Sequence, residues 1–449
     1  MSVTALVYGM AITGEAVARA LHDRGVRVLV ADDAPNDAKS AAAASIGAEL
    51  IASPVGEVLD DLIARSDMVC PAPGVPETHR VIESANRQGK AIRMELDLAY
   101  EWEQQRSGGP RPMLAVTGTD GKTTTTMMAA AMLRCAGLKA AAVGNTELPL
   151  ISALDNDVDA FVVECSSFRL NWLAHFRSEA SVWLNLAPDH LNWHTSMQAY
   201  EQAKARMWSH NRPTDVAVGF AADPVVMRNL SAATGRKYTF GTDGADYHLD
   251  GSVLSGPSGP IADRATMTRD LPHDVTNALA AAAIAVESGL ASAAAVAEAL
   301  ATFEHPPHRI EPLGEFGGAR WYNDSKATTP HAAITAIRGF TKVVLLAGGR
   351  NKGLDLAGLA DEHARVKAVV ALGEAAPIIR EAFAPWCEVV EVASMQAAVG
   401  AAARLAHAGD TVLLSPGCAS FDWYPDGGYP ARGDDFKRLV HNHFRNGAR

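Results

Sequence analysis

A glycine-rich loop carries the strongest chemical signal in the sequence. Gly118-Thr119-Asp120-Gly121-Lys122-Thr123 follows the apolar run 113–116 and precedes an Ala- and Met-rich helical stretch. Glycines let backbone N–H groups approach phosphate oxygens, and a helix N-terminus adds partial positive charge. In such loops the lysine contacts the outer phosphates and the next hydroxyl reaches Mg²⁺. We therefore predict a nucleotide site, whose residues are Gly118, Thr119, Asp120, Gly121, Lys122, Thr123 and Thr124.

This loop is shorter than the common phosphate-binding loop. The common form has a glycine five residues before Gly121, where this chain has Val116. The difference disfavours ordinary GTPases and transport ATPases. A glycine-rich turn that binds no phosphate is the alternative, but the order of strand, loop and helix favours the nucleotide site.

Candidate metal ligands follow two apolar runs. Glu164 comes directly after the run 160–163, and His190 follows the run 181–186. A carboxylate at the carboxyl end of a strand, beside a phosphate loop, is well placed to bind a hard metal ion. Read alone, a histidine in the position of His190 is more often structural than a metal ligand. Lys204, in the helical stretch 200–204, reads alone as a solvated surface lysine.

The N-terminal residues resemble a dinucleotide-binding fingerprint. Gly9-Met10-Ala11-Ile12-Thr13-Gly14 follows an apolar run, and Asp32 follows the next one about 20 residues later. Ala11 replaces the central glycine, which normally allows close approach to a pyrophosphate. NAD binding is therefore one interpretation of this segment, and a weakly supported one.

Alternating strand and helix patterns must position these residues. Apolar runs of strand length are separated by helical stretches in the first and last thirds of the chain, which predicts βαβ units and parallel sheets. The expected strands are 5–8, 26–31, 68–70, 113–116, 160–163, 181–186, 320–322, 343–346, 368–372, 389–392 and 412–414, and the expected helices include 14–23, 277–290 and 394–408.

Two linkers divide the chain. The stretch 107–112 is rich in Gly and Pro, and Glu304-His305-Pro306-Pro307-His308 reads as a hinge. A length of 449 residues is compatible with about three domains. We expect domains at 1–109, 110–305 and 306–449.

Composition excludes several classes of protein. There are 40 Lys and Arg against 51 Asp and Glu, so a nucleic-acid partner is not expected. The five cysteines include no CxxC pair, which favours reduced thiols and a cytoplasmic location. No apolar stretch reaches the roughly 20 residues needed to cross a bilayer, so membrane insertion is not expected either.

Taken together, the motifs resemble those of the Mur ligase family, whose members join amino acids to a peptidoglycan precursor. The motifs are TGTDGKTTT, ECSSF, LNLAPDHLNWH, YEQAKARMW, PHRIE, NDSKATTP and LLSPGCASFD, and they occur in this order along the chain. The similarity is greatest to the members that add D-glutamate to UDP-N-acetylmuramoyl-L-alanine. It implies a Rossmann-like N-terminal domain, a central P-loop ATPase-type domain with a mostly parallel sheet, and a Rossmann-like C-terminal domain.

The resemblance assigns roles to residues that are unremarkable alone. It implies that ATP and two Mg²⁺ ions bind, and that CO₂ converts Lys204 into a carbamate that serves as an anionic metal ligand. The implied catalytic residues are Lys122, His190, Lys204 and Lys326, and the implied metal ligands are Thr123, Glu164, His190 and Lys204. The resemblance also implies that ATP contacts Asn277, Arg309 and Asp324 in addition to the loop residues.

The same resemblance implies two substrate sites. The UDP-sugar contacts are Ile12, Thr13, Asp32, Asp33, Gly74 and Asn145. The amino-acid contacts are Lys326, Thr328, Lys352, Ser420 and Tyr429. These substrates are small molecules, and the family pattern is a monomer.

The chain departs from the family pattern at four places. His273-Asp274 stands where His-Asn is usual, Ala72 replaces a serine, and Arg169 stands where many members have glutamine. The stretch that contains Tyr429 is about two residues longer than usual. The last change leaves the preference for D- or L-glutamate open.

The implied reaction is ATP-dependent amide formation. The substrate carboxylate attacks the γ-phosphate, and glutamate then attacks the acyl phosphate through a tetrahedral intermediate. Closure of the third domain would bring Arg309, Lys326 and Lys352 to the site. The alternatives are a related ligase with a different acceptor, including L-glutamate or a folylpolyglutamate-type substrate, and a non-catalytic nucleotide-binding regulator.

Overall fold

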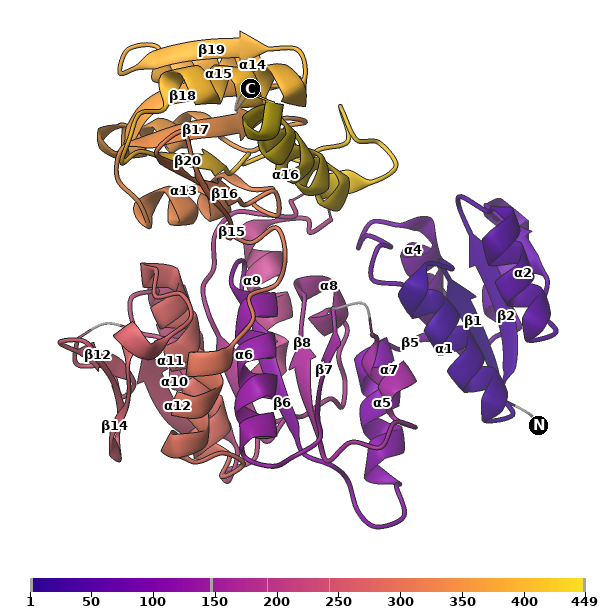
Figure 1. The fold of residues 1–449 in the computed structure, drawn as a ribbon. Helices are drawn as coiled ribbons and strands as arrows, with labels where there is room; N and C mark the ends of the chain where they lie inside the picture. Colours follow the sequence, from indigo (N-terminus) through magenta and orange to yellow (C-terminus); the bar gives the residue numbers. More distant parts are fainter. Residues whose placement is uncertain (1–2, 146–147, 192, 242, 447–449) are drawn as a thin grey trace. The chain divides into compact units, whose positions relative to one another are not determined.

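The structure is a computed structural model that describes residues 3–145, 148–191, 193–241 and 243–446. The chain forms two compact units (Figure 1). Unit 1 comprises Met1–Thr268 and Val275–Phe303, and unit 2 comprises Arg269–Asp274 and Glu304–Arg449. The short stretch Arg269–Asp274 thus belongs with the C-terminal residues, although unit 1 flanks it on both sides in the sequence.

Unit 1 begins with a parallel five-stranded sheet in the order β3-β2-β1-β4-β5. Its strands are β1 (Thr4–Tyr8), β2 (Arg27–Asp32), β3 (Leu50–Ala52), β4 (Met68–Pro71) and β5 (Ala91–Ile92). The helices that connect these strands are α1 (Ile12–Asp23), α2 (Asp37–Ser45), α3 (Gly56–Ala64) and α4 (Arg80–Arg87). Every residue of β1 is buried, as expected for the central strand of a sheet covered on both faces.

A second, six-stranded parallel sheet forms the middle of unit 1, in the order β11-β10-β9-β6-β8-β7. Its strands are β6 (Met113–Thr117), β7 (Ala140–Gly144), β8 (Ala160–Glu164), β9 (Ala180–Trp183), β10 (Val216–Phe220) and β11 (Arg236–Phe240). Its helices are α6 (Lys122–Cys135), α7 (Leu150–Ala153), α8 (Ser167–Leu170), α9 (Met197–Ala205), α10 (Pro224–Ala232), α11 (Pro272–Glu287) and α12 (Ala293–Thr302). Helices α6 and α12 pack against each other beside this sheet (Figure 1).

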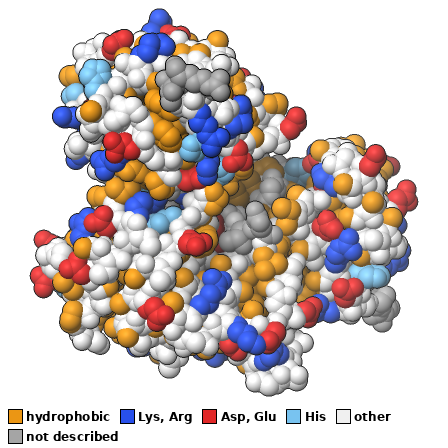
Figure 2. Space-filling model, in the orientation of Figure 1, with side chains coloured by type: hydrophobic (Ala, Val, Ile, Leu, Met, Phe, Trp, Pro, Cys, Tyr) orange, Lys and Arg blue, Asp and Glu red, His pale blue; other side chains and the backbone are white. Residues whose placement is uncertain are grey.

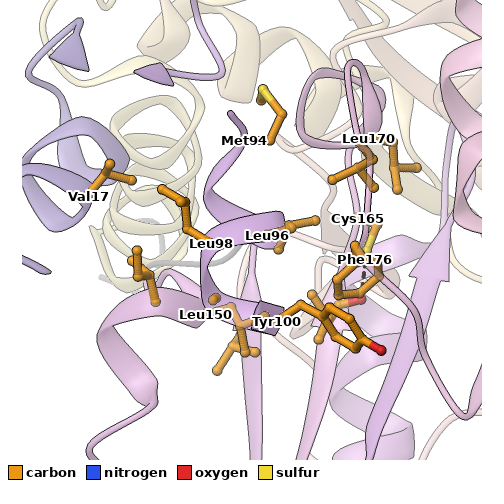
Figure 3. Packing of buried hydrophobic residues seen from close by; sticks show 14 of the residues in the cluster. Val17, Met94, Leu96, Leu98, Tyr100, Leu150, Cys165, Leu170 and Phe176 are labelled. Atoms are coloured by element: carbon orange, nitrogen blue, oxygen red, sulfur yellow. Dashed lines mark hydrogen bonds between the residues drawn. The ribbon is translucent and has the colours of Figure 1, made fainter. Parts of the chain in front are cut away.

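The helix α5 (Glu95–Gln104) joins the two sheets of unit 1 into one packed body. Leu96, Leu98 and Tyr100 of α5 lie in a hydrophobic cluster with Val17 of α1 and Leu150 of α7 (Figure 3). Such continuous apolar packing removes surface from water on both sides of α5. The predicted boundary at residue 109 falls after this helix and stays a prediction.

Unit 2 contains a six-stranded sheet in the order β15-β16-β20-β17-β18-β19, in which only β15 is antiparallel to its neighbour. Its strands are β15 (Glu311–Phe316), β16 (Ala319–Asn323), β17 (Val343–Gly348), β18 (Val366–Leu372), β19 (Glu388–Val392) and β20 (Thr411–Leu414). Its helices are α13 (Pro330–Arg338), α14 (Ala376–Phe383), α15 (Met395–Leu405) and α16 (Gly428–Asn446), together with a 3₁₀ segment at Ala357–Arg365.

The predicted α/β class with parallel sheets is confirmed, and the main differences are local. The sequence pattern did not reveal the small antiparallel sheet β12 (His248–Asp250), β13 (Val253–Gly256) and β14 (Gly259–Asp263). Its strands are short and only partly buried, so they lack a long apolar run. Helix α11 begins at Pro272, five residues before the predicted start, because proline is favourable in a first helical turn.

Acidic and basic side chains are interspersed over the face drawn in Figure 2. Within the described residues, no helix is long and apolar enough to cross a membrane. The expectations of a cytoplasmic location and a monomer stay predictions.

Candidate active site

The phosphate loop lies between β6 and α6, as predicted. Gly121 adopts a left-handed conformation (φ 82°) immediately before the helix, and Gly118 has φ 154°. A Cβ at Gly121 would come within 2.6 Å of the Asn277 side-chain oxygen, and one at Gly118 within 2.9 Å of Leu184 Cβ. Both positions therefore need glycine for space as well as for backbone conformation. Lys122 Nζ donates to the carbonyls of Gly118 and Thr119 at 2.9 and 2.7 Å, so its ammonium lies over the loop.

Two residues missed by the sequence reasoning hold this loop in place. Asn185 Oδ1 accepts hydrogen bonds from the backbone N–H groups of Thr119 and Asp120, each at 2.9 Å. The Tyr200 hydroxyl lies 3.1 Å from the Thr119 hydroxyl. Asn185 occurs in the motif LNLAPDH, two residues after β9, so its position after a strand was the available signal. These contacts fix the conformation of the loop.

Lys204 is a buried amine, which contradicts its reading as a solvated lysine. It projects from α9, is only 1% exposed, and donates through Nζ to Gly118 O at 2.7 Å. Burial lowers the pKa of Lys204 well below its usual value, and the nearby Lys122 ammonium lowers it further. A neutral amine is therefore favoured beside the phosphate loop.

Glu164 and Asn145 lie together at the carboxyl ends of β8 and β7. Asn145 Nδ2 donates to Glu164 Oε1 at 3.1 Å, and Asn145 N donates to Glu164 O at 2.9 Å. The other carboxylate oxygen, Glu164 Oε2, is buried without a hydrogen-bond partner in the protein. A buried carboxylate oxygen is costly unless a ligand or ion satisfies it.

His190 lies beside the loop in a strained backbone conformation. Its φ is 57°, a left-handed value that is uncommon outside glycine. Its imidazole Nε2 is 3.1 Å from Asp189 Oδ2, and its ring packs edge-on against Phe168 with centroids 4.6 Å apart. The Tyr200 ring is a further aromatic neighbour, with centroids 6.3 Å apart. Strain of this kind is found preferentially at functional sites.

The residues present fit Mg²⁺ as a hard cation that requires oxygen ligands. Among the described residues, no group of three or more His, Cys, Asp or Glu side chains is arranged to hold a metal. The unpartnered Glu164 oxygen is one suitable ligand. The hydroxyl of Thr123, a half-buried residue at the start of α6, is the ligand that the loop motif predicts. A metal site here needs a further oxygen ligand.

Asn277, predicted to contact ATP, lies on α11 next to the loop. Its Oδ1 accepts from the Thr125 hydroxyl at 3.3 Å and stands close to Gly121. The structure therefore brings the predicted nucleotide residues of unit 1 together.

Among the predicted UDP-sugar residues, Ile12 and Thr13 begin α1 and Asp32 binds the backbone just before this helix, whereas Asn145 lies with Glu164. Several of their polar groups already have protein partners. The Thr13 hydroxyl accepts from Arg169 Nη2 at 2.8 Å, and Arg169 Nη1 pairs with Glu95 at 2.5 Å. Both members of this ion pair are buried. Arg169, which replaces the usual glutamine, thus ties α8 to α1 and α5.

Asp32 and Asp33 differ in their partners. Asp32 accepts from the backbone N–H of Met10 at 2.6 Å and pairs with Lys39 at 2.8 Å. Asp33 is bound by Tyr8 and His79 at 2.7 and 2.8 Å and also by Arg80. Ile12 is 65% exposed at the start of α1, and Gly74 is also exposed, so both are accessible to a ligand.

In unit 2, Asp324 lies at the end of β16 and is fully buried among polar groups. It accepts from the Ser415 hydroxyl at 2.7 Å and from Ile310 N at 3.2 Å. Burial raises the pKa of Asp324 to about 7, although these hydrogen bonds and the Arg309 guanidinium oppose the rise. Arg309 is half-buried in the adjoining segment.

Most predicted amino-acid contacts converge on the start of α16. Lys326 Nζ lies 4.0 Å from the centroid of the Tyr429 ring, a cation–π arrangement. Ser420 Oγ is buried without a hydrogen-bond partner in the protein. Thr328 is half-buried, whereas Lys352 is exposed and close enough to oppose the burial-driven rise in the pKa of Cys418.

Arg432 connects the start of α16 to Ser325 and to the segment before Ser420, a role that the sequence pattern did not reveal. It is 2% exposed and donates to the hydroxyl and carbonyl of Ser325 at 2.9 and 2.8 Å. It also donates to the carbonyls of Cys418 and Ala419, which precede Ser420. Arg432 follows Tyr429 by less than one helical turn, but its partners are about 14 and 107 residues distant, so no local pattern could have revealed its role.

Comparison with known proteins gives three successive domain matches. Residues 3–93 match the Mur ligase MurD-like N-terminal domain, residues 116–285 the Mur ligase middle domain, and residues 308–418 the Mur ligase glutamate ligase domain. These matches confirm the predicted order of three domains, while the boundaries at 109 and 305 stay predictions.

Similar proteins match nearly the full length. The chain is 40% identical to the UDP-N-acetylmuramoylalanine--D-glutamate ligase of Frankia casuarinae, over 97% of this chain and 93% of that protein. It is 34% identical to the protein of the same name in Streptomyces coelicolor, over 97% of both chains.

Solved structures share the fold at low identity. The UDP-N-acetylmuramate-alanine ligase of Thermotoga maritima has a TM-score of 0.60 at 19% identity and covers both chains completely. The MurF ligase of the same organism in complex with ADP has a TM-score of 0.62 at 16% identity, covering 86% of this chain and 91% of that one. With the three domain matches and the full-length relatives, this places the chain in the Mur ligase family of ATP-dependent amide-forming ligases.

Proposed function

We propose that this protein joins D-glutamate to UDP-N-acetylmuramoyl-L-alanine at the expense of ATP, a cytoplasmic step in the synthesis of peptidoglycan precursors. The observation that carries the proposal is the convergence of two lysine amines, Lys122 and Lys204, on the carbonyl of Gly118. The neighbouring strand β8 ends in Glu164, which pairs with Val116 and has an unpartnered carboxylate oxygen. The names of the full-length relatives supply the substrates.

The first chemical step transfers a phosphoryl group. The carboxylate of the substrate's alanine attacks the γ-phosphorus of ATP, the bond to the β–γ bridging oxygen breaks, and ADP leaves. Lys122 and the N–H groups at the start of α6 stabilise the negative charge on the phosphates. Asn277 and Asp324 are assigned to the nucleoside, and Arg309 to the phosphates because its planar fork suits them.

The second step forms the amide. The amine of glutamate attacks the acyl-phosphate carbon, giving a tetrahedral intermediate that expels inorganic phosphate and loses a proton. Lys326, Thr328, Lys352 and Ser420 are assigned to bind and orient glutamate, and Tyr429 to pack against it. The unpartnered hydroxyl of Ser420 supports a ligand contact there.

Two Mg²⁺ ions would be held by Thr123, Glu164, His190 and a carbamate on Lys204, and would neutralise phosphate charge when bound. Carbamate formation requires a neutral amine, whose nitrogen attacks CO₂ and loses a proton. The lowered pKa of Lys204 supports this modification. The resulting anionic oxygens would supply the further ligand that the protein side chains alone lack.

Phosphate release from ATP in the presence of Mg²⁺ and UDP-N-acetylmuramoyl-L-alanine tests the proposal. We expect release with D-glutamate and little with L-glutamate or without an amino acid. Release only with L-glutamate would keep the mechanism and change the acceptor. Release without any amino acid would indicate an ATPase, and no release in any mixture would favour a nucleotide-binding regulator or a different precursor.

A further inference from the structure

An ion pair at the start of α11 holds two successive peptide groups, Arg309–Ile310 and Ile310–Glu311. Arg269 donates through Nε and Nη2 to the two carboxylate oxygens of Asp274, at 2.6 and 2.7 Å. Asp274 is completely buried, and the Arg269 side chain is 13% exposed. Because both oxygens are engaged by one planar group, the direction of the guanidinium is fixed.

The remaining nitrogen of that guanidinium reaches the hinge segment. Arg269 Nη1 donates to the carbonyl oxygens of Arg309 and Ile310, both at 2.8 Å. A lysine could not make this set of bonds, because it has one nitrogen instead of a planar fork of three. One side chain therefore connects Asp274 to two successive peptide groups beside Arg309.

The hinge backbone needs such support because it is strained. His308 has φ 60° and Ile310 has φ 49°, and left-handed values are unfavourable for both, above all for a β-branched residue. Strained conformations persist only where the surroundings over-determine them. On the opposite side, Asp324 accepts from Ile310 N at 3.2 Å, and His308 O accepts from Lys326 N at 3.0 Å.

Asp274 also faces other titratable groups. His273 Nε2 lies 3.5 Å and His305 Nδ1 3.8 Å from Asp274 Oδ1. Burial lowers the pKa of both histidines, so Arg269 is the permanent cation of this cluster. The carboxylate at position 274, where the family usually has asparagine, therefore matches the arginine at 269.

We propose that Arg269 is a positioning residue for the reaction: paired with Asp274, it fixes the backbone of Arg309 and so directs the Arg309 guanidinium toward the phosphates of ATP. The inference rests on the proposed nucleotide role of Arg309. It predicts that Arg269 affects catalysis only through Arg309, whereas a purely structural residue would affect it independently.

A double-mutant cycle tests this prediction. With the other substrates saturating, we expect Arg269→Lys to lower kcat/KM for ATP about tenfold and to leave KM for glutamate and for the UDP-sugar unchanged. In an Arg309→Ala background, the same substitution should cost less than about twofold. Equal losses in both backgrounds would overturn the proposal, as would a matching rise in KM for glutamate.

The cycle separates this inference from the assigned role of Arg309. If Arg309→Ala itself leaves kcat/KM for ATP unchanged, the nucleotide role fails and the inference fails with it. If Arg309→Ala is impaired and the losses are additive, only the inference fails. Arg338→Lys is the matched control, because Arg338 pairs with Glu362 at 2.6 Å in the same unit and no hydrogen bond links that pair to the hinge carbonyls.

A second variant keeps the proposal testable if Arg269→Lys does not fold. Thermal unfolding is measured for each protein, and Asp274→Asn replaces Arg269→Lys in the cycle if the latter does not fold. Asparagine has nearly the same volume as aspartate but can accept only one of the two guanidinium bonds. We expect a loss of about threefold that likewise disappears in the Arg309→Ala background, and persistence of the loss there would overturn the proposal.

Discussion

The phosphate loop of unit 1 and the residues proposed to bind glutamate in unit 2 are organised in different ways. In the loop, Asn185, Lys122 and Lys204 form hydrogen bonds with backbone groups, so protein contacts fix the conformation of the loop. In unit 2, the Ser420 hydroxyl is unpartnered and Lys352 is exposed. The difference indicates that the proposed nucleotide site is held by contacts within the protein, whereas the proposed glutamate site leaves a buried hydroxyl available for a ligand.

The largest expected effect is at the centre of the loop. Lys122→Ala should lower phosphate release at least about a thousandfold, because in the proposed mechanism the lysine stabilises charge that develops on the phosphates. Circular dichroism and thermal unfolding should remain near those of the unchanged protein. Lys139→Ala, which removes an exposed lysine paired with Asp157, is the matched control. Substantial activity in Lys122→Ala would contradict the assignment of the loop.

In unit 2, Asp324 should make stability depend on pH. Its folded pKa of about 7 exceeds the ordinary aspartate pKa of 3.8, so the folded state binds the proton more tightly. The stabilisation is therefore full below pH 3.8 and is lost as the pH rises through 7. Relative to Asp324→Asn, the free energy of unfolding should fall by on the order of 3 kcal/mol between pH 4 and 7. Denaturant titrations at several pH values measure the free energy of unfolding of both proteins. Free energies that change with pH in parallel would contradict the predicted effect of Asp324.

A third variant tests whether activity requires a carbamate on Lys204, beside the phosphate loop. Lys204→Arg cannot form a carbamate, and we expect it to lower turnover about a hundredfold because an oxygen ligand for Mg²⁺ is lost. With ¹³C-labelled bicarbonate, the unchanged protein should show a carbamate signal in carbon NMR that the variant lacks. Full activity of Lys204→Arg, or a signal that persists in it, would remove Lys204 from the metal site.

The smallest expected effect is on the residues proposed to bind glutamate in unit 2. Tyr429→Leu removes the ring beside Lys326 and should raise KM for glutamate about fivefold, with KM for ATP unchanged. Tyr429→Phe keeps the ring and should behave like the unchanged protein. An equal rise in both Michaelis constants would mean that Tyr429 stabilises unit 2 in general and does not shape the proposed glutamate site.

Local motifs explain how much of the site the sequence could predict. Gly118, Gly121 and Lys122 lie within five consecutive residues between a strand and a helix, so spacing alone indicated their chemistry. The resemblance to the family added Lys204, whose helical pattern by itself suggested a solvated residue. The structure reveals its burial because α9 packs against the loop from a position 86 residues away in the sequence.

Periodicity and motif spacing are local properties, so the amino-acid sequence was enough to predict the α/β class, the order of three domains and the position of the phosphate loop. The distant side chains that support the site became evident only in the folded molecule. Arg432 joins segments about 107 residues apart, and Arg269 reaches carbonyls 40 and 41 residues away. Such contacts depend on how buried polar groups find partners once the chain is folded, and neighbouring residues carry no signal of that pairing.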